Sequence, residues 1–185
     1  MKKLFSILVC LCMLAGCGST DSDMDPIIAL RQALQTGKSS FLLDITADHE
    51  QTLTEFSLSC LSDINGDVSF AVSEPQSICG ISGRITEKGG ELTFDDQVLA
   101  ISPVADQDIS PVMVPWLLIK ALRGGHLDSV STEDDGIRLQ ILDTYEDQVF
   151  SLHIWIDGNN TPYFADFIVN ERRVLSCRIR EFSIL

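Results

Sequence analysis

Apolar residues recur at every second position through most of this chain, and this period constrains the fold more than any other feature. The alternating runs are 41–45, 56–60, 68–72, 81–85, 137–141 and 150–156. Because successive side chains of a β-strand point to opposite faces, each run predicts a strand with one buried face. Asn65-Gly66 and Gly89-Gly90 are turn signals between such runs. The pattern therefore predicts a meander of antiparallel strands.

Two segments break this period and predict helices. Asp25-Pro26 supplies a helix N-cap and a first-turn proline, and Gly37 supplies a stop about three turns later. The second segment, Pro115 to Arg123, is apolar nearly all round and runs into Gly124-Gly125. A helix of that composition is buried. The predicted fold class is α+β, with the helices segregated to one face of a large antiparallel sheet.

The N-terminus has the features of a bacterial lipoprotein signal. Lys2 and Lys3 precede an apolar run over 4–14, which is shorter than the roughly 20 residues of a membrane-spanning helix. The run ends in Leu14-Ala15-Gly16-Cys17, which matches the lipobox pattern L-[AS]-[GA]-C. Cys17 is therefore the expected lipidation site and the first residue of the mature protein. The alternative is an ordinary secretory signal with an incidental cysteine.

This signal divides the chain into three expected parts. Residues 1–16 are the signal peptide, residues 17–25 are the lipidated cysteine and an acidic tether, and residues 26–185 form one domain. Two or more acyl chains anchor a protein stably, so we expect a location on the extracytoplasmic face of the cell membrane. No aspartate retention signal follows Cys17, because the next residue is Gly18. In a Gram-negative cell that favours the outer membrane.

The charge of the chain restricts its partners. The formal net charge is −14, and removal of residues 1–16 takes away Lys2 and Lys3 and makes it −16. Binding to nucleic acid relies on Lys and Arg contacts to phosphate, so we expect no nucleic-acid partner. Because the mature chain is strongly acidic, we also do not expect it to lie flat on an anionic membrane surface.

Three cysteines remain after the signal and the lipidated cysteine are set aside: Cys60, Cys79 and Cys177. A disulfide is allowed outside the cytoplasm, and a bond between Cys60 and Cys79 is one hypothesis. The alternative is three small buried hydrophobic residues. The chain has no CxxC motif and no Cys/His cluster, so we expect neither a metal nor a cofactor.

Motifs of common enzyme classes are absent from the sequence. There is no G-x-S-x-G elbow, no P-loop and no G-x-G-x-x-G. His49, His126 and His153 are scattered along the chain. Asp157-Gly158-Asn159 begins like a calcium loop, but position twelve would be Ile168, where a bidentate glutamate is needed. We therefore expect a protein that is not an enzyme.

The order of these segments resembles the LolA/LolB-like family of lipoprotein carriers and related bacterial lipoproteins. Three segments carry the resemblance: the opening helix with the strand after it, the proline-rich stretch around Pro115-Trp116, and Ile154-Trp155-Ile156-Asp157 followed by Pro162 and two closing strands. The resemblance covers nearly all of the mature chain as architecture. It implies an open half-barrel with a large curved antiparallel sheet, whose helices cover the concave face and which holds acyl chains.

The chain also departs from these proteins. LolA is not lipidated, whereas Cys17 carries a lipobox. LolB uses an exposed apolar loop, and no isolated loop of that kind can be recognised here. Some clostridial spore-germination lipoproteins also resemble the family, and they are implied to act by binding a peptidoglycan amidase.

Two functional hypotheses follow. The first is a non-enzymatic binding module for a hydrophobic ligand, such as an acyl chain or a lipoprotein, held between the sheet and the Trp116 helix. Its candidate lining residues are Phe41, Leu43, Phe56, Leu58, Phe70, Trp116, Leu117, Ile141, Leu152 and Ile154. Such residues can also simply fill a core. The second hypothesis is a protein–protein partner of a cell-envelope enzyme, such as a peptidoglycan amidase in spore germination.

Overall fold

The structure is a computed structural model of the whole chain. It describes residues 24–48, 53–95, 97–101, 104–105, 108–145 and 148–185. The expectations for Cys17, for the signal peptide, for most of the tether and for His49 lie outside the described residues.

Eleven antiparallel strands form one open sheet, in the order β6-β5-β4-β3-β2-β1-β13-β12-β11-β10-β9. The strands of this sheet are β1 (Ser39–Asp48), β2 (Leu53–Ser62), β3 (Val68–Glu74), β4 (Ser82–Thr86), β5 (Gly89–Phe94), β6 (Gln97–Ile101), β9 (His126–Glu133), β10 (Gly136–Tyr145), β11 (Gln148–Asp157), β12 (Pro162–Val169) and β13 (Arg172–Ile184). A separate pair consists of β7 (Val104–Ala105) and β8 (Asp108–Ile109). The alternating runs of the sequence are therefore strands, joined mainly by hairpins.

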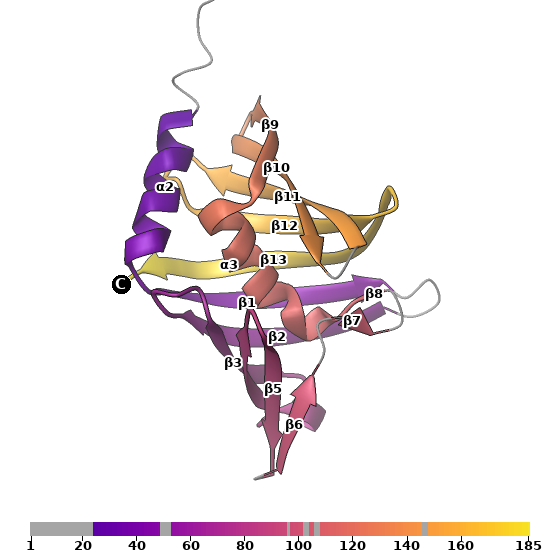
Figure 1. Cartoon of the computed structure of the whole chain (residues 1–185). Coiled ribbons are helices and arrows are strands. Elements are labelled where there is room, and N and C mark those ends of the chain that lie inside the picture. Colours follow the sequence, from indigo (N-terminus) through magenta and orange to yellow (C-terminus); the bar gives the residue numbers. More distant parts are fainter. Residues whose placement is uncertain (1–23, 49–52, 96, 102–103, 106–107, 146–147) are drawn as a thin grey trace, which may run out of the picture.

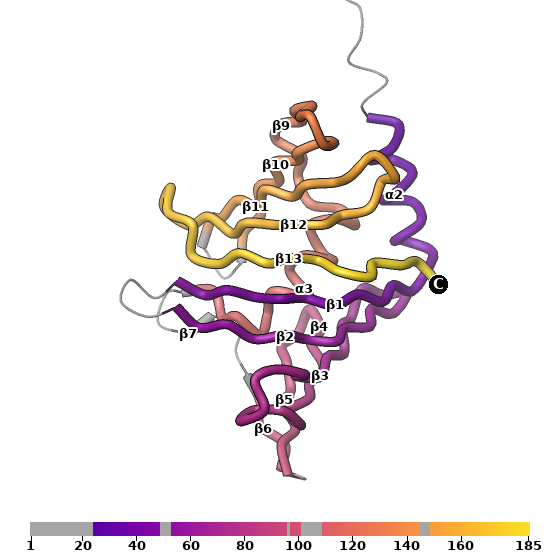
Figure 2. The backbone as a smooth tube through the Cα atoms, turned by 180° about the vertical axis from the view of Figure 1, so that it is seen from behind, coloured from indigo at the N-terminus to yellow at the C-terminus, as the bar shows by residue number. Residues whose placement is uncertain are grey.

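The first and the last strands pair at the centre of the sheet. β1 lies between β2 and β13, with Leu43 opposite both Leu58 and Ile179. The sheet thus has two arms, β2–β6 on one side and β12–β9 on the other. In Figures 1 and 2, β1 and β13 run nearly from side to side, whereas β5 and β6 run nearly from top to bottom. The sheet is therefore strongly twisted.

Two α-helices lie on the same side of the sheet. α2 (Met24–Thr36) buries Ile27, Leu30 and Leu34. α3 (Val114–Gly124) follows two short 3₁₀ helices in the chain order, η1 (Gln76–Ile78) and η2 (Pro111–Met113). It crosses the sheet between the two arms and packs against α2 (Figure 1). None of the helices in the described part of the chain is long and apolar enough to cross a bilayer.

The core fills the space between the sheet and α3. One face of every central strand is buried: β1 contributes Phe41, Leu43 and Ile45, and β11 contributes Leu152 and Ile154. Leu118 and Ile119 of α3 are fully buried against this face. The predicted fold class is confirmed: a large antiparallel sheet carries its helices on one face, as in an open half-barrel. We call the helix-covered face the inner face and the opposite one the outer face.

Candidate binding groove

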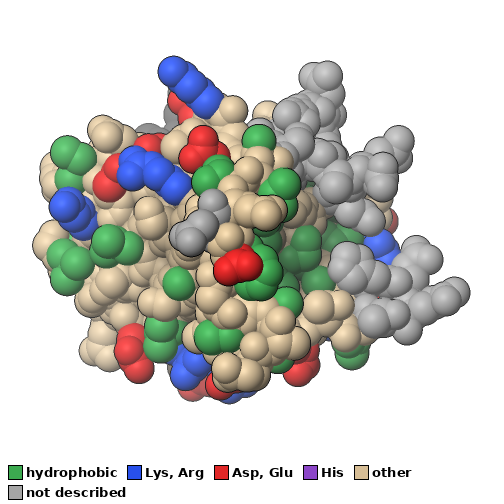
Figure 3. All heavy atoms as spheres, turned by 90° about the horizontal axis from the view of Figure 1, so that it is seen from below, with side chains coloured by type: hydrophobic (Ala, Val, Ile, Leu, Met, Phe, Trp, Pro, Cys, Tyr) green, Lys and Arg blue, Asp and Glu red, His purple; other side chains and the backbone are tan. Residues whose placement is uncertain are grey.

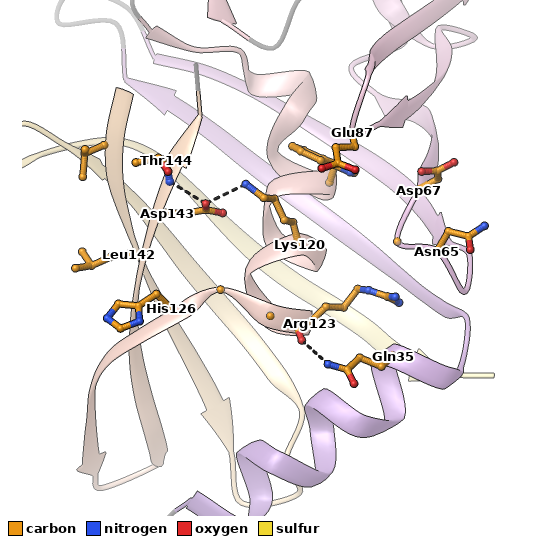
Figure 4. Close-up of a pocket in the computed structure, with 15 residues that line it drawn as sticks. Gln35, Asn65, Asp67, Glu87, Lys120, Arg123, His126, Leu142, Asp143 and Thr144 are labelled. Atoms are coloured by element: carbon orange, nitrogen blue, oxygen red, sulfur yellow. Dashed lines mark hydrogen bonds and ion pairs between the residues drawn. The ribbon is translucent and has the colours of Figure 1, made fainter. Parts of the chain in front are cut away.

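A groove of about 730 Å³ lies on the side of α3 that faces away from the sheet. We call it the α3 groove. The turn between β2 and β3 and the turn between β4 and β5 form one wall, and β10 and β11 form the other (Figure 4). Its lining residues are Gln35, Asn65, Gly66, Asp67, Glu87, Trp116, Lys120, Arg123, Gly124, Gly125, His126, Leu142, Asp143, Thr144 and Val149. The two arms of the half-barrel therefore enclose a space above the helix.

A stripe of three side chains on α3 forms the floor of this groove. Trp116, Lys120 and Arg123 recur at positions i, i+4 and i+7, which places them on one face of the helix. Lys120 Nζ lies 2.9 Å from Asp143 Oδ1 on β10 and 5.5 Å from the centroid of the Trp116 ring. The ammonium group is thus held by an ion pair and by a cation–π contact. Sequence analysis missed this stripe because the helix was read as apolar all round.

Arg123 closes the other end of the floor by joining three elements. Its guanidinium donates hydrogen bonds to Leu34 O at the end of α2 and to Ile64 O in the β2–β3 turn. The carbonyl of Arg123 accepts a hydrogen bond from Gln35 Nε2, at 3.0 Å. Gly66 packs against this side chain, since a Cβ atom at Gly66 would lie 3.1 Å from Arg123 Nε. The groove is therefore built on a fixed floor.

The ten residues predicted to line a ligand cavity do not lie around one open space. Phe41, Leu43, Leu58, Phe70, Trp116, Leu117, Ile141, Leu152 and Ile154 are all buried in the core. Phe56 is half-buried against it. Only Trp116 among them reaches the α3 groove. The space between sheet and helix is filled by packing, and the α3 groove lies on the other side of the helix.

The structure does not join Cys60 and Cys79, the pair of the disulfide hypothesis. All three described cysteines are free thiols. Cys60 lies on β2 and is buried, whereas Cys79 follows η1 outside the sheet and is exposed. Burial raises the pKa of the Cys177 thiol to about 12, and burial also raises the pKa of Cys60. Cys60 and Cys177 are thus buried, as the alternative hypothesis of small buried residues expects, whereas Cys79 is exposed.

A row of polar side chains crosses the outer face of the sheet. His153 on β11 is opposite Asp166 on β12, which is opposite Ser176 on β13. These are the residue types of a serine-hydrolase triad, but in such a triad the imidazole lies between serine and carboxylate so that it can take the serine proton. Here the carboxylate lies in the middle. Burial and the nearby Arg138 lower the pKa of His153.

A second groove, on the outer face, crosses β1, β2, β12 and β13, with a volume of about 750 Å³. Asp44 lies in it and accepts hydrogen bonds from Arg180 Nη2 and Ser57 Oγ, both at 2.8 Å. Burial raises the pKa of Asp44, but the two hydrogen bonds and the guanidinium charge outweigh it, so the pKa is lowered. Among the described residues, no three His, Cys, Asp or Glu side chains are grouped to hold a metal ion.

The β5–β6 hairpin exposes apolar side chains at one end of the sheet. Phe94 is 52%, Val98 62% and Leu99 64% exposed. Leu99 is opposite Leu92, which is opposite Gly83 on β4, so Leu92, Phe94 and Leu99 continue the inner face beyond its helix cover. Figure 3 views the molecule from the end where this hairpin lies and shows hydrophobic side chains exposed among acidic ones. An exposed apolar segment of this kind was not recognised from the sequence.

Comparison with protein families returned no matching family model. Comparison with curated proteins returned no match either. Solved structures do match. An uncharacterized conserved protein from Thermus thermophilus has 14% identical residues and a TM-score of 0.50, over 89% of this chain and 88% of that one. This similarity is one of fold.

Other solved structures are similar at lower scores. A LolA superfamily protein from Nitrosomonas europaea has 13% identity and a TM-score of 0.44, over 87% of this chain and 91% of its own. LprF from Mycobacterium bovis has 9% identity and a TM-score of 0.44, over 89% of this chain and 95% of its own.

Proposed function

We propose that this protein is a membrane-tethered binding module that is not an enzyme, and that its ligand has an apolar part, such as an acyl chain. The tether would be the lipid on Cys17, and the binding site would be the α3 groove. The residues of the sheet that face α3 would act as the scaffold and not as the lining.

The size and position of the α3 groove carry this proposal. A volume of about 730 Å³ is within the range of pockets that bind small molecules. Trp116 gives it apolar surface, and the floor is fixed by Arg123. Polar side chains at the rim can orient a head group, while the fixed floor lowers the entropic cost of binding.

Extraction of bound lipid tests the proposal. The full chain, purified from membranes, is extracted with organic solvent, which leaves covalent anchors on the protein and releases bound ligand for mass spectrometry. Glu87→Trp places a large ring in the groove at an exposed side chain (Figure 4), and Leu61→Trp introduces the same ring at an exposed position outside the groove. We expect Glu87→Trp to reduce the released ligand at least about fivefold.

Leu61→Trp should release as much ligand as the unmodified chain. Equal amounts from both variants, or no ligand from any of the three proteins, would contradict binding in the α3 groove. The comparison between two tryptophan variants removes the contribution of lipid that adheres nonspecifically.

The exposed β5–β6 hairpin favours a second candidate function, a docking module for a cell-envelope enzyme such as a peptidoglycan amidase. Phe94, Val98 and Leu99 are the exposed side chains that would take part. A photo-crosslinking amino acid at Leu99 should give one discrete adduct in living cells, whereas the same group at Leu61 should give none. The absence of an adduct at Leu99 would remove this candidate.

A further inference from the structure

One long edge of the sheet is open to another extended chain. β6 is the last strand at its end of the sheet, and no described strand pairs with its outer edge. In an antiparallel ladder, every second residue of an edge strand points its backbone N–H and C=O away from its one neighbour. Such groups can hydrogen-bond to a strand of another molecule. Gln97, Val98, Leu99 and Ala100 are all exposed, so a partner can reach this edge.

The two edges of the sheet differ in how they resist such pairing. β9, at the opposite edge, carries Asp128 and Glu133, and its register with β10 shifts between Gln140 and Ile141. Charged side chains and bulges are the usual protection of an edge strand. β6 runs from Gln97 to Ile101 without a charge, a proline or a register shift against β5. It is therefore the unprotected edge.

The inner face beside β6 would accept apolar side chains. Leu99 lies opposite Leu92, and Phe94 lies opposite Gln97, so the inner side of the hairpin is largely apolar. Leu99 and Phe94 are more than half exposed. A strand added to β6 would place every second side chain on this surface, where cross-strand apolar pairs stabilise a sheet.

The outer face beside β6 would accept cations. Glu91 lies opposite Ala100, is exposed, and forms no ion pair with any residue that the structure describes. An added strand would lie about 10 Å from β5, which is two strand spacings. Because Ala100 places only a methyl group between them, a lysine or arginine of that strand can extend over it to the Glu91 carboxylate.

Neighbouring cations do not offset this acidity. Arg84 Nη2 lies 2.8 Å from Asp67 Oδ2 and 3.1 Å from Asp63 Oδ2, so one guanidinium faces two carboxylates. In and around the hairpin two cations stand against five carboxylates: Arg84 and Lys88 against Asp63, Asp67, Glu87, Glu91 and Asp95. A second copy of this chain would bring the same carboxylates and a formal net charge of −14 to the contact, so like charges oppose self-pairing.

From this arrangement we propose that β6 binds an extended segment of a partner protein by strand addition, and that this segment alternates apolar residues with lysine or arginine. The inference rests on the second candidate function, because it gives the docking hairpin a binding mode and a class of partner. It is independent of ligand binding in the α3 groove.

Two synthetic peptides test the binding mode. The full chain in phosphatidylcholine nanodiscs is titrated, by fluorescence anisotropy, against a labelled peptide of the sequence Lys-Val-Lys-Val-Lys-Val-Lys, with empty nanodiscs as the blank. The second peptide has the same sequence with every internal backbone nitrogen methylated, so its charges and side chains stay and its backbone donors are lost. We expect the methylated peptide to bind at least about tenfold more weakly.

Matched variants of the chain test the position of the bound strand. Glu91→Gln removes the carboxylate beside β6, and we expect it to weaken binding of the unmethylated peptide about threefold. Glu55→Gln removes the same charge from an exposed position on β2 and should leave binding unchanged. Equal weakening in both variants would show that only the net charge attracts the peptide and would overturn the inference.

The outcomes separate this inference from the candidate function on which it rests. No binding of the unmethylated peptide, or equal binding of the two peptides, would overturn strand addition. A discrete adduct at Leu99 in living cells would still leave the hairpin as a docking surface. An adduct with the mass of two copies of this chain would show that a second copy occupies the edge and would overturn the proposed class of partner.

Discussion

At the scale of single residues, Arg123 joins parts of the chain that are far apart in the sequence. Its partners are residues 34, 35 and 64, and all of them contact it through backbone or amide groups. The sequence around these partners does not predict the contacts, because a backbone carbonyl can belong to a residue of any type. The same applies to the Lys120–Asp143 pair, whose members are brought together by the fold.

Loss of the Arg123 contacts should destabilise the fold. We expect Arg123→Ala to lower the free energy of unfolding by about 2 kcal/mol, since two carbonyls lose hydrogen bonds from a charged donor. Arg123→Lys should recover only part of this, because an ammonium lacks the planar fork of a guanidinium. Urea denaturation measures both. Lys88→Ala, at the exposed β4–β5 turn, is the control and should change stability by less than about 0.5 kcal/mol.

Asp166 should destabilise the protein at neutral pH. Its Oδ1 is buried and has no hydrogen-bond partner in the described part of the chain, and burial raises its pKa, a shift that Arg173 and His153 oppose. Because the folded-state pKa lies above the unfolded one, stability falls as pH rises through that window and stays reduced above it. We expect Asp166→Asn to stabilise the fold by about 1 kcal/mol at pH 7.

This gain should vanish near pH 3, below both pKa values, where the aspartic acid is neutral in the folded and the unfolded states. Denaturation curves of both proteins across pH 3–8 give the comparison. Asp128→Asn, at an exposed position on β9, is the matched control. A gain that is independent of pH would show that the effect of Asp166→Asn does not come from its carboxylate charge.

At the scale of elements, the sequence periodicity predicted where strands and helices lie. It did not predict which parts of the sheet the helices cover. The strand at 41–45, the opening helix and the buried helix after Pro115 all lie where the alternation and the turn residues indicated. Leu92 and Leu99 lie on the inner face of β5 and β6, at an end of the sheet that none of the described helices covers. Period alone does not tell how far the helix cover extends.

The interior side of α3 should be intolerant of truncation. Leu118 is fully buried between the helix and the sheet, and Leu118→Ala should lower the free energy of unfolding by about 2–5 kcal/mol through the cavity it leaves. Leu61→Ala removes the same atoms from a side chain that is 47% exposed and should have a much smaller effect. Urea or thermal denaturation measures the difference. Similar losses for the two variants would mean that α3 is not a structural part of the core.

At the scale of the whole molecule, β1 pairs with β13, and this long-range pairing could not be predicted from local sequence pattern. Ser39 lies opposite Ile184, so strands from the two ends of the domain meet at the centre of the sheet. This pairing makes two arms, and the two arms make the groove above α3. The candidate site could therefore not be placed from sequence, although Trp116, Lys120 and Arg123 had the helical spacing of a shared face.

The last prediction concerns attachment of the whole molecule to a membrane. α2 and α3 are 13 and 11 residues long, and no helix of the described residues has the length and hydropathy of a membrane span. If Cys17 carries the anchor, Cys17→Ser should abolish incorporation of a radioactive fatty acid, because the serine lacks the thiol that takes the diacylglycerol. The label should remain in Cys79→Ser, which removes an exposed thiol elsewhere in the chain. Label retained in Cys17→Ser would show that the lipobox interpretation is wrong, whereas binding in the α3 groove is tested separately by the extraction of bound lipid.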